Sequence, residues 1–159
     1  MATERPPFLP PALGLLMMLG VFTAHFVRPI AMLFPFPLNY LALLPISVGV
    51  LLTVLADREF RRKGVVNENG QYLDNAGVLV TSGIYGLTRN PTYLGLVLII
   101  IGLAIWVGSL SPWLIVLLFV FLLRRTYIAN EERRLSAQFG DRYRQYCRLV
   151  PRWLIRLSR

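Results

Sequence analysis

The chain has 159 residues, of which 55% are hydrophobic and 16% charged, and its formal net charge is +9. A soluble domain has about a quarter of its residues charged, so this composition favours a membrane protein if the apolar residues cluster into spans. The single cysteine, Cys147, excludes an intramolecular disulfide, and the single histidine, His25, excludes metal sites built from several histidines.

Four apolar segments approach the length of about 20 residues that a helix needs to cross a bilayer. They run roughly over Pro10–Val27, Leu38–Ala56, Pro91–Gly108 and Pro112–Leu123. The first lacks the small-residue cleavage site of a signal peptide, so we expect a retained helix. Pro45 is expected to kink the second helix, whereas Pro112 suits the first position of the fourth. The predicted fold class is an all-α integral membrane protein with about four transmembrane helices.

The basic residues are distributed very unevenly over this four-helix arrangement. Arg28 falls on one side, and all the others fall on the opposite side, among them Arg5, the cluster from Arg58 to Lys63, Arg89 and every arginine from Arg124 onward. By the positive-inside rule, we expect both termini to lie on the cytoplasmic side of the membrane, which we expect to be a bacterial inner membrane. These charges face anionic lipid, at about 1 kcal/mol each, so they do not call for a nucleic-acid partner.

The chain is expected to form one domain, 1–159, in which residues 1–56 carry two spans, 57–90 a cytosolic loop lobe, and 91–159 a helical hairpin with a C-terminal segment. The pair Asn69-Gly70 predicts a turn in the lobe. After the fourth span, apolar and aromatic residues recur at helical spacing and predict a single amphipathic helix in the membrane interface. These residues are Leu135, Phe139, Tyr143 and Tyr146.

The last two spans form two arms of matched length. About 20 residues separate Asn90 from the turn near Ser109–Ser111, and about 20 more separate that turn from Glu131. At a rise of about 1.5 Å per residue, the Arg89-Asn90-Pro91 corner and the Glu131-Glu132 pair return to the same depth. Two adjacent glutamates are costly against lipid, so we expect them to face a wet or charged cavity.

Two segments around this hairpin carry a family resemblance. They read "LVTSGIYGLTRNPTYLG", beginning at Leu79, and "EERRLSAQFGDRYRQYCRLVPRW", ending at Trp153. In this order and spacing they resemble the isoprenylcysteine carboxyl methyltransferase family and its bacterial relatives, within a wider group of small membrane methyltransferases that includes the phospholipid N-methyltransferases. The resemblance covers close to half of the chain and leaves out the first two spans.

This resemblance implies that S-adenosyl-L-methionine is the methyl donor, bound on the cytosolic side, and that a tunnel from the bilayer admits a lipophilic acceptor or lipid. Transferred residue by residue, the cofactor would be lined by Tyr85, Asn90, Pro91 and Tyr93, and Glu131 or Glu132 would hold its ammonium or ribose hydroxyls. Arg89, or Arg124 or Arg125, would orient an acceptor carboxylate. Methyl transfer requires alignment and exclusion of water rather than a metal. No feature of the sequence requires an obligate protein partner.

One position departs from the family pattern. Members that methylate prenylcysteine typically read Arg-His-Pro where this chain reads Arg89-Asn90-Pro91. Asparagine cannot titrate near neutral pH, so the acceptor stays open between a lipid amine, a small lipophilic thiol and an isoprenoid carboxylate.

Simpler explanations exist for the same residues. Asn90 and Pro91 also suit an ordinary helix start, and the twin glutamates also suit pairing with neighbouring arginines. For Tyr127 a place in the interfacial aromatic belt is favoured, and Cys147 is expected to be inert.

Three other classes of protein also have this general pattern. A small four-helix transporter is disfavoured because no acidic residue lies in the apolar centre of a span. A nicotinamide-dependent membrane reductase and a structural subunit are the remaining alternatives.

Overall fold

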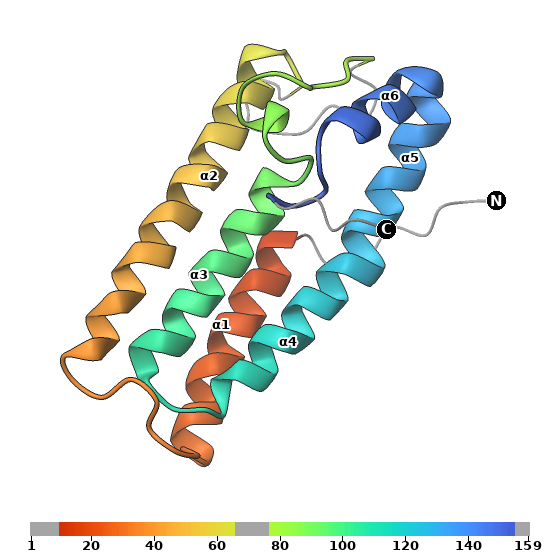
Figure 1. Cartoon of the computed structure of the whole chain (residues 1–159). Helices are drawn as coiled ribbons and strands as arrows, with labels where there is room; N and C mark the ends of the chain where they lie inside the picture. The colour runs from red at the N-terminus through yellow and green to blue at the C-terminus, as the bar shows by residue number, and fades with distance from the viewer. Residues whose placement is uncertain (1–9, 66–76, 155–159) are drawn as a thin grey trace.

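The computed structural model describes residues 10–65 and 77–154, and within these ranges the fold is all-helical. Arg5, the Asn69-Gly70 turn and most of the predicted lobe lie outside the described residues. Four helices run side by side, and their antiparallel order brings the end of α2, the start of α3 and the end of α4 to the same end of the bundle (Figure 1). They are α1 (Pro10–Val27), α2 (Leu43–Arg62), α3 (Pro91–Val107) and α4 (Pro112–Leu122).

The first helix has the predicted bounds, and the second differs from its predicted segment at both ends. A 3-10 turn, η1 (Leu38–Ala42), precedes α2, and α2 continues past Ala56 to Arg62. Pro45 lies in the first turn of α2, a position where proline is tolerated, and the kink expected there stays a prediction. The basic cluster therefore lies on the last helical turns of α2 rather than in a loop.

The hairpin of α3 and α4 has the predicted bounds. Pro91 and Pro112 stand at the starts of the two helices, where a proline without an N–H costs no helical hydrogen bond. Gly108 ends α3 in a left-handed conformation with φ of 84°, and its carbonyl accepts hydrogen bonds from Leu33 and Phe34 at 2.7 and 3.0 Å. A side chain here would meet the Phe34 carbonyl oxygen at 2.6 Å, so the turn requires glycine.

The helix that begins at α4 changes its winding before it reaches the twin glutamates. A π-helical turn, η3 (Leu123–Ile128), joins α4 to α5 (Ala129–Phe139), and Thr126 Oγ1 donates to the Leu122 carbonyl at 2.6 Å within it. A π turn inserts one extra residue into the helical repeat and is frequent at functional sites. The face that α5 presents is therefore shifted relative to that of α4.

The single amphipathic helix expected after α4 is wrong: two helices occupy this region. Gly140, with φ of 51°, ends α5, and α6 (Asp141–Leu149) folds back (Figure 1). The spacing of apolar residues continues unchanged across the glycine, so periodicity alone could not show the break. Tyr143, Tyr146 and Val150 are buried in a cluster with Leu79, Leu135 and Phe139, so this apolar face packs against the protein.

Small residues bring α2 and α3 into close contact. A Cβ at Gly95 would lie 2.5 Å from Thr53 Oγ1 and 2.6 Å from the Gly49 carbonyl oxygen. Gly102 packs in the same way against Ile46 and the Ala42 carbonyl. The largest core cluster of the described residues joins α1, α3, α4 and η3 and includes the fully buried Val21, Ile100, Phe119 and Leu123.

Large hydrophobic side chains cover much of the outer surface of the bundle. Leu44 is 71% exposed, and Leu114 and Leu117 are each 67% exposed. By length and composition, Leu38–Arg62 and Pro112–Phe139 could each cross a membrane, while Ala12–Val27 and Pro91–Val107 are shorter apolar helices. An apolar exterior of this extent indicates association with lipid.

Candidate functional site

The corner that precedes α3 is fastened to the segment that follows α6. The Arg89 backbone N–H donates to the Pro151 carbonyl at 3.0 Å, and two side chains donate to the Arg152 carbonyl, Thr88 Oγ1 at 3.1 Å and Asn90 Nδ2 at 3.0 Å. Thr88 and Asn90 are buried. Asn90 makes no side-chain capping bond to α3, so a plain N-cap role does not describe it. Its amide holds the C-terminal segment instead.

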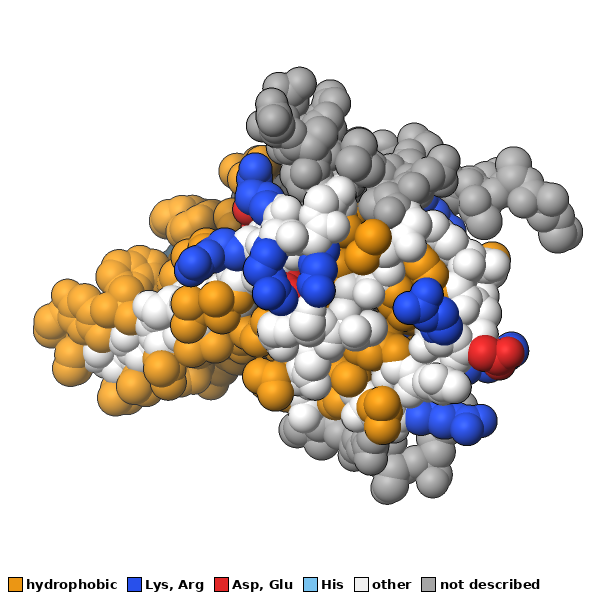
Figure 2. All heavy atoms as spheres, turned by 90° about the horizontal axis from the view of Figure 1, so that it is seen from above, with side chains coloured by type: hydrophobic (Ala, Val, Ile, Leu, Met, Phe, Trp, Pro, Cys, Tyr) orange, Lys and Arg blue, Asp and Glu red, His pale blue; other side chains and the backbone are white. Residues whose placement is uncertain are grey.

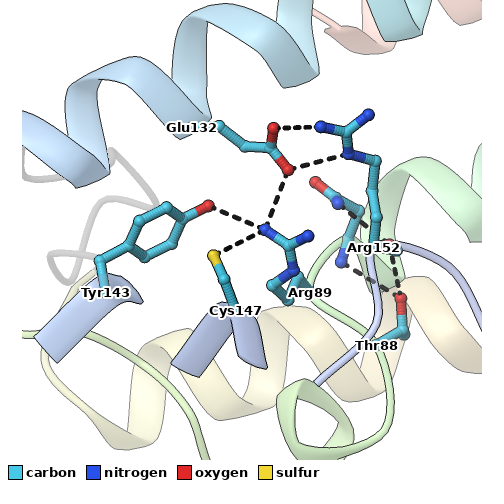
Figure 3. Close-up of polar contacts among 7 residues, drawn as sticks. Thr88, Arg89, Glu132, Tyr143, Cys147 and Arg152 are labelled. Carbon is cyan, nitrogen blue, oxygen red and sulfur yellow. Dashed lines mark hydrogen bonds and ion pairs between the residues drawn. The ribbon is translucent and has the colours of Figure 1, made fainter. Parts of the chain in front are cut away.

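Glu132 joins this corner to α5 through two arginines (Figure 3). Its Oε1 accepts from Arg89 Nη1 at 3.0 Å and from Arg152 Nε at 2.9 Å, and its Oε2 accepts from Arg152 Nη2 at 2.5 Å. The Arg89 and Glu132 side chains are only 14% and 19% exposed. The matched arms of the hairpin therefore bring the Arg-Asn-Pro corner and the twin glutamates together, as their lengths predicted.

Arg89 is held by α6 as well. Its Nη1 donates to Cys147 Sγ at 2.8 Å and lies 3.4 Å from the Tyr143 hydroxyl (Figure 3). Its Nε is buried and has no hydrogen-bond partner among the described residues. Two guanidinium groups thus share one carboxylate, which leaves an excess of one positive charge and one unused buried donor. Such an arrangement is suited to an anionic oxygen.

The neighbouring Glu131 has a different partner. It interacts with the Tyr93 hydroxyl, which belongs to the first turn of α3. The Tyr93 ring packs near Tyr127, with 6.5 Å between ring centroids. Tyr127 is only 7% exposed and belongs to the helical core, so the interfacial-belt interpretation of this residue is wrong. The twin glutamates are therefore divided between a cationic cluster and a tyrosine.

Tyr85 positions the turn that leads into the corner. It lies in the 3-10 turn η2 (Gly83–Gly86), its ring stacks on Phe60 of α2 at 4.9 Å, and its carbonyl accepts from the Tyr146 hydroxyl at 2.7 Å. Burial raises the pKa of Tyr146, so the hydroxyl remains a donor at neutral pH. Tyr85 thus connects α2 to α6 beside the site.

Tyr143 and Arg152, two ionisable groups around Glu132, also have raised pKa values. Burial raises the pKa of Tyr143, and the nearby Cys147 acts in the same direction. The hydrogen bonds from Arg152 to Glu132 raise the pKa of Arg152, so the guanidinium remains charged. Around neutral pH, Tyr143 is therefore neutral and Arg152 is charged.

The structure does not bring Arg124 to this cluster. Arg124 and Arg125 are exposed on the π-helical turn, and Arg125 lies over the Phe121 ring at 5.6 Å. Among residues 10–65 and 77–154, no hydrogen bond or ion pair joins either arginine to Arg89 or Glu132. The assignment of Arg124 or Arg125 to an acceptor carboxylate is independent of these contacts and stays a prediction.

Sequence reasoning missed three members of the cluster. Cys147, which we expected to be inert, contacts Arg89, and Tyr143 and Arg152 complete the set. Tyr143 and Cys147 are four residues apart and so share a helix face, a signal that was available. Arg152 follows Pro151 beyond the end of α6, and only the tertiary fold places it against Glu132.

The sequence that forms this site matches a family of known proteins. The model of the phospholipid methyltransferase family matches residues 38–142, about two thirds of the chain. The chain belongs to this family. The resemblance to membrane methyltransferases that its motifs predicted is therefore confirmed. Tyr143, Cys147 and Arg152 lie just beyond the matched region.

Individual relatives overlap with parts of the chain. An "Uncharacterized protein" of Haemophilus influenzae is 42% identical over 62 residues, which are 39% of this chain and 98% of that protein. A protein-S-isoprenylcysteine O-methyltransferase of Schizosaccharomyces pombe is 35% identical over 74 residues, 46% of this chain and 31% of its own length. The cobalt-zinc-cadmium resistance protein CzcN of Cupriavidus metallidurans is 36% identical over 80 residues, 50% and 37% of the two chains. The chain thus spans about a third of the last two relatives. No solved structure matches it significantly.

Proposed function

We propose that this chain transfers a methyl group from S-adenosylmethionine to a lipophilic acceptor that reaches the site from the membrane. The observation that carries the proposal is the partly buried cluster of Arg89, Glu132 and Arg152, with the buried Arg89 Nε left without a partner among the described residues. Membership of a methyltransferase family supports the reaction class. The acceptor classes are an isoprenylcysteine-type carboxylate, a lipid amine and a small thiol.

The charges around the site fit both ends of this cofactor. The excess positive charge at Arg89 and Arg152 would hold the cofactor's carboxylate, and the unused Arg89 Nε supplies a donor for it. Both oxygens of Glu132 already accept from arginines, so Glu131 is the better carboxylate for the ammonium group. The ring of Tyr93 offers an aromatic face to a positively charged ligand, at about 0.5–2 kcal/mol, whereas the predicted cofactor residue Tyr85 is buried with its ring stacked on Phe60.

When bound, S-adenosylmethionine supplies an electrophilic methyl group on a sulfonium. The residues of this chain hold and align rather than exchange protons. Arg89 is fixed by Glu132, Cys147 and Tyr143, and Asn90 is fixed by the Arg152 carbonyl. Because Asn90 cannot titrate, we assign it to holding the corner and not to deprotonating the acceptor. The hydrogen bonds to the C-terminal segment cover this side of the corner, and such cover favours the exclusion of water that methyl transfer requires.

The same proposal includes the placement of the protein. We infer that α1, α2, α3 and the long helix that begins with α4 each span a bacterial inner membrane, with the α5–α6 end and both termini in the cytoplasm. The exposed leucines on α2 and α4 support lipid contact, and the arginines at the ends of α2 and α4 support this orientation. Arg28 lies at the other end of the bundle, where its carbonyl accepts from Ser111 beside the turn between α3 and α4.

Ligand binding by the purified chain in detergent tests the cofactor assignment. We expect S-adenosylmethionine to raise the Tm, whereas reduced nicotinamide cofactor has no effect. The Arg89→Gln variant should lose at least about tenfold in affinity, since one charge-assisted hydrogen bond is worth about 1.5–3 kcal/mol.

A matched control removes an arginine outside the cluster. Arg144 pairs with Asp141 on the exposed face of α6, where its side chain is 68% exposed, so Arg144→Gln should bind within about twofold of wild type. Stabilisation by the nicotinamide cofactor alone would favour the reductase alternative. A chain that responds to neither ligand would favour the transporter or the structural subunit. Incubation with labelled S-adenosylmethionine and membranes from the source cell would then identify the acceptor.

A further inference from the structure

A second polar region lies outside the cluster around Arg89. A groove of about 760 Å³ runs between the last turns of α2 and η2. Its lining combines three arginines and one glutamate with apolar side chains and a glycine: Leu55, Arg58, Glu59, Arg61, Arg62, Gly83, Ile84 and Leu87. Seen from this end of the molecule, basic side chains stand directly beside exposed hydrophobic ones (Figure 2).

Glu59 lines the bottom of this groove, and its negative charge is balanced by Arg62. Although only 8% exposed, it accepts from Arg62 Nη2 at 2.5 Å and from Ser82 Oγ at 2.6 Å. The backbone of η2 lies directly on it, because a Cβ at Gly83 would stand 2.9 Å from Glu59 Oε2. The buried carboxylate therefore holds α2 and η2 together and carries no free negative charge into the groove.

Two of the three arginines of the groove form ion pairs with carboxylates of α2. Arg61 pairs with Asp57 at 2.7 Å, and Arg62 pairs with Glu59. Arg58 is exposed, and among the residues described in the structure no hydrogen bond or ion pair holds it. The groove thus has a net positive charge centred on Arg58, with the exposed edges of Arg61 and Arg62 nearby.

The apolar part of the groove continues along the lipid-facing side of α2. Leu87 is 63% exposed at one wall, and Leu51 and Val54 are 56% and 47% exposed one to two turns earlier on α2. Cationic groups at the end of an apolar helix lie at the depth of lipid phosphates. A ligand that matches the whole lining has an anionic head and an apolar tail.

We propose that this groove binds one anionic phospholipid, with its phosphate at Arg58 and Arg62 and an acyl chain along Leu55, Ile84 and Leu87. The lipid would contact η2, which leads directly into the Arg89 corner. This site is separate from the methyl-transfer site, and its test requires neither cofactor nor turnover.

The probe is phosphatidylglycerol titrated onto the purified full chain in neutral detergent, with retained lipid counted by native mass spectrometry. Wild type should keep one phosphatidylglycerol at lipid concentrations at which phosphatidylcholine is not retained. The Arg58→Gln variant should bind about fivefold more weakly, the effect of about 1 kcal/mol per basic residue. Leu87→Asn removes the apolar wall without touching charge and should also weaken retention.

Arg142→Gln is the matched control, because Arg142 is an exposed arginine of α6 outside the groove. It removes the same charge from the same end of the molecule and should leave retention within about twofold. Equal losses in the Arg58 and Arg142 variants would show diffuse attraction of charge and overturn the proposal. Displacement of the lipid by excess inorganic phosphate would show an anion site without an acyl contact, which also overturns it. Thermal unfolding of each variant verifies that these exposed substitutions leave the fold intact.

Discussion

Two contacts of α3 with the rest of the molecule are built on opposite principles. Along its length, α3 meets α2 through glycines whose backbones approach so closely that no Cβ fits. At its start, the Arg89 corner meets α5 and α6 through charged and polar side chains. The first contact depends on shape and fixes the fold. The second depends on charge, leaves a buried donor of Arg89 unused among the described residues, and is the part that a ligand could use.

The sharpest test of this contrast is Gly95→Ala. The added methyl group would lie 2.5 Å from Thr53 Oγ1 and 2.6 Å from the Gly49 carbonyl oxygen, and the backbone atom cannot move aside. We expect the free energy of unfolding to fall by about 3 kcal/mol, the upper part of the usual range for overpacking. Unfolding by denaturant in mild detergent measures it.

Gly14→Ala serves as the control for this substitution. A Cβ at Gly14 would meet only Leu96 Cδ2 at 3.6 Å, an ordinary contact. Alanine also favours helix, so stability should stay unchanged or rise by up to about 1 kcal/mol. A loss in the Gly14 variant as large as in the Gly95 variant would remove the steric explanation.

Separate substitutions of Glu131 and Glu132 distinguish the roles of the two glutamates in the polar contact. Glu132→Gln should lower the free energy of unfolding by about 2 kcal/mol, because Arg89 and Arg152 lose a shared carboxylate in a site that is mostly buried. Glu131→Gln keeps a polar group of the same shape beside the Tyr93 hydroxyl, so stability should change by less than about 1 kcal/mol. If Glu131 holds the cofactor's ammonium group, that variant should still lose about tenfold in S-adenosylmethionine affinity.

Denaturant unfolding and S-adenosylmethionine titration of both variants measure the two stabilities and the two affinities. Identical profiles for the two would contradict the assignment of separate partners. The Arg144→Gln variant supplies the baseline for a surface ion pair.

A smaller effect is expected where α6 meets η2. Tyr146→Phe removes one hydrogen bond to the Tyr85 carbonyl and should cost about 1 kcal/mol at neutral pH. Since burial raises the pKa of Tyr146 above the unfolded value of about 10, the native state holds this proton more tightly. Stability is therefore fully present below about pH 10 and declines as pH rises further.

The phenylalanine variant should show a shallower alkaline decline than wild type in unfolding experiments across this pH range. Tyr143 maintains part of the decline, because burial raises its pKa too. Tyr40→Phe, at the exposed far end near Trp106, is the control and should leave the slope unchanged. A Tyr146 variant with the wild-type slope would mean that this hydroxyl does not titrate with unfolding.

The features that sequence predicted well are those with a local backbone cause. Pro91, Gly108 and Pro112 each have conformational requirements that mark helix ends, so the hairpin and its matched arms followed from them. The approach of Arg89 to Glu132 then needed only a count of residues.

The features that sequence did not predict depend on tertiary structure. The reversal at Gly140 leaves the helical periodicity unbroken, and it alone brings Cys147 and Arg152 to Arg89. The π turn that carries Arg124 was also not predicted, because it leaves the apolar composition of the span unchanged, and the role of Arg124 toward an acceptor stays a prediction.

That π turn has a consequence for how the chain tolerates change in length. With about 100° of rotation per residue, one residue more or fewer between α4 and α5 would swing both glutamates around the helix axis by roughly a quarter turn. Glu132 would then leave the two arginines while the lipid-facing side of α4 stayed where it is. The six residues Leu123–Ile128 thus set the rotation of the polar helix α5 relative to the apolar helix α4. Deleting a single residue there should disturb the site more than replacing its exposed side chains.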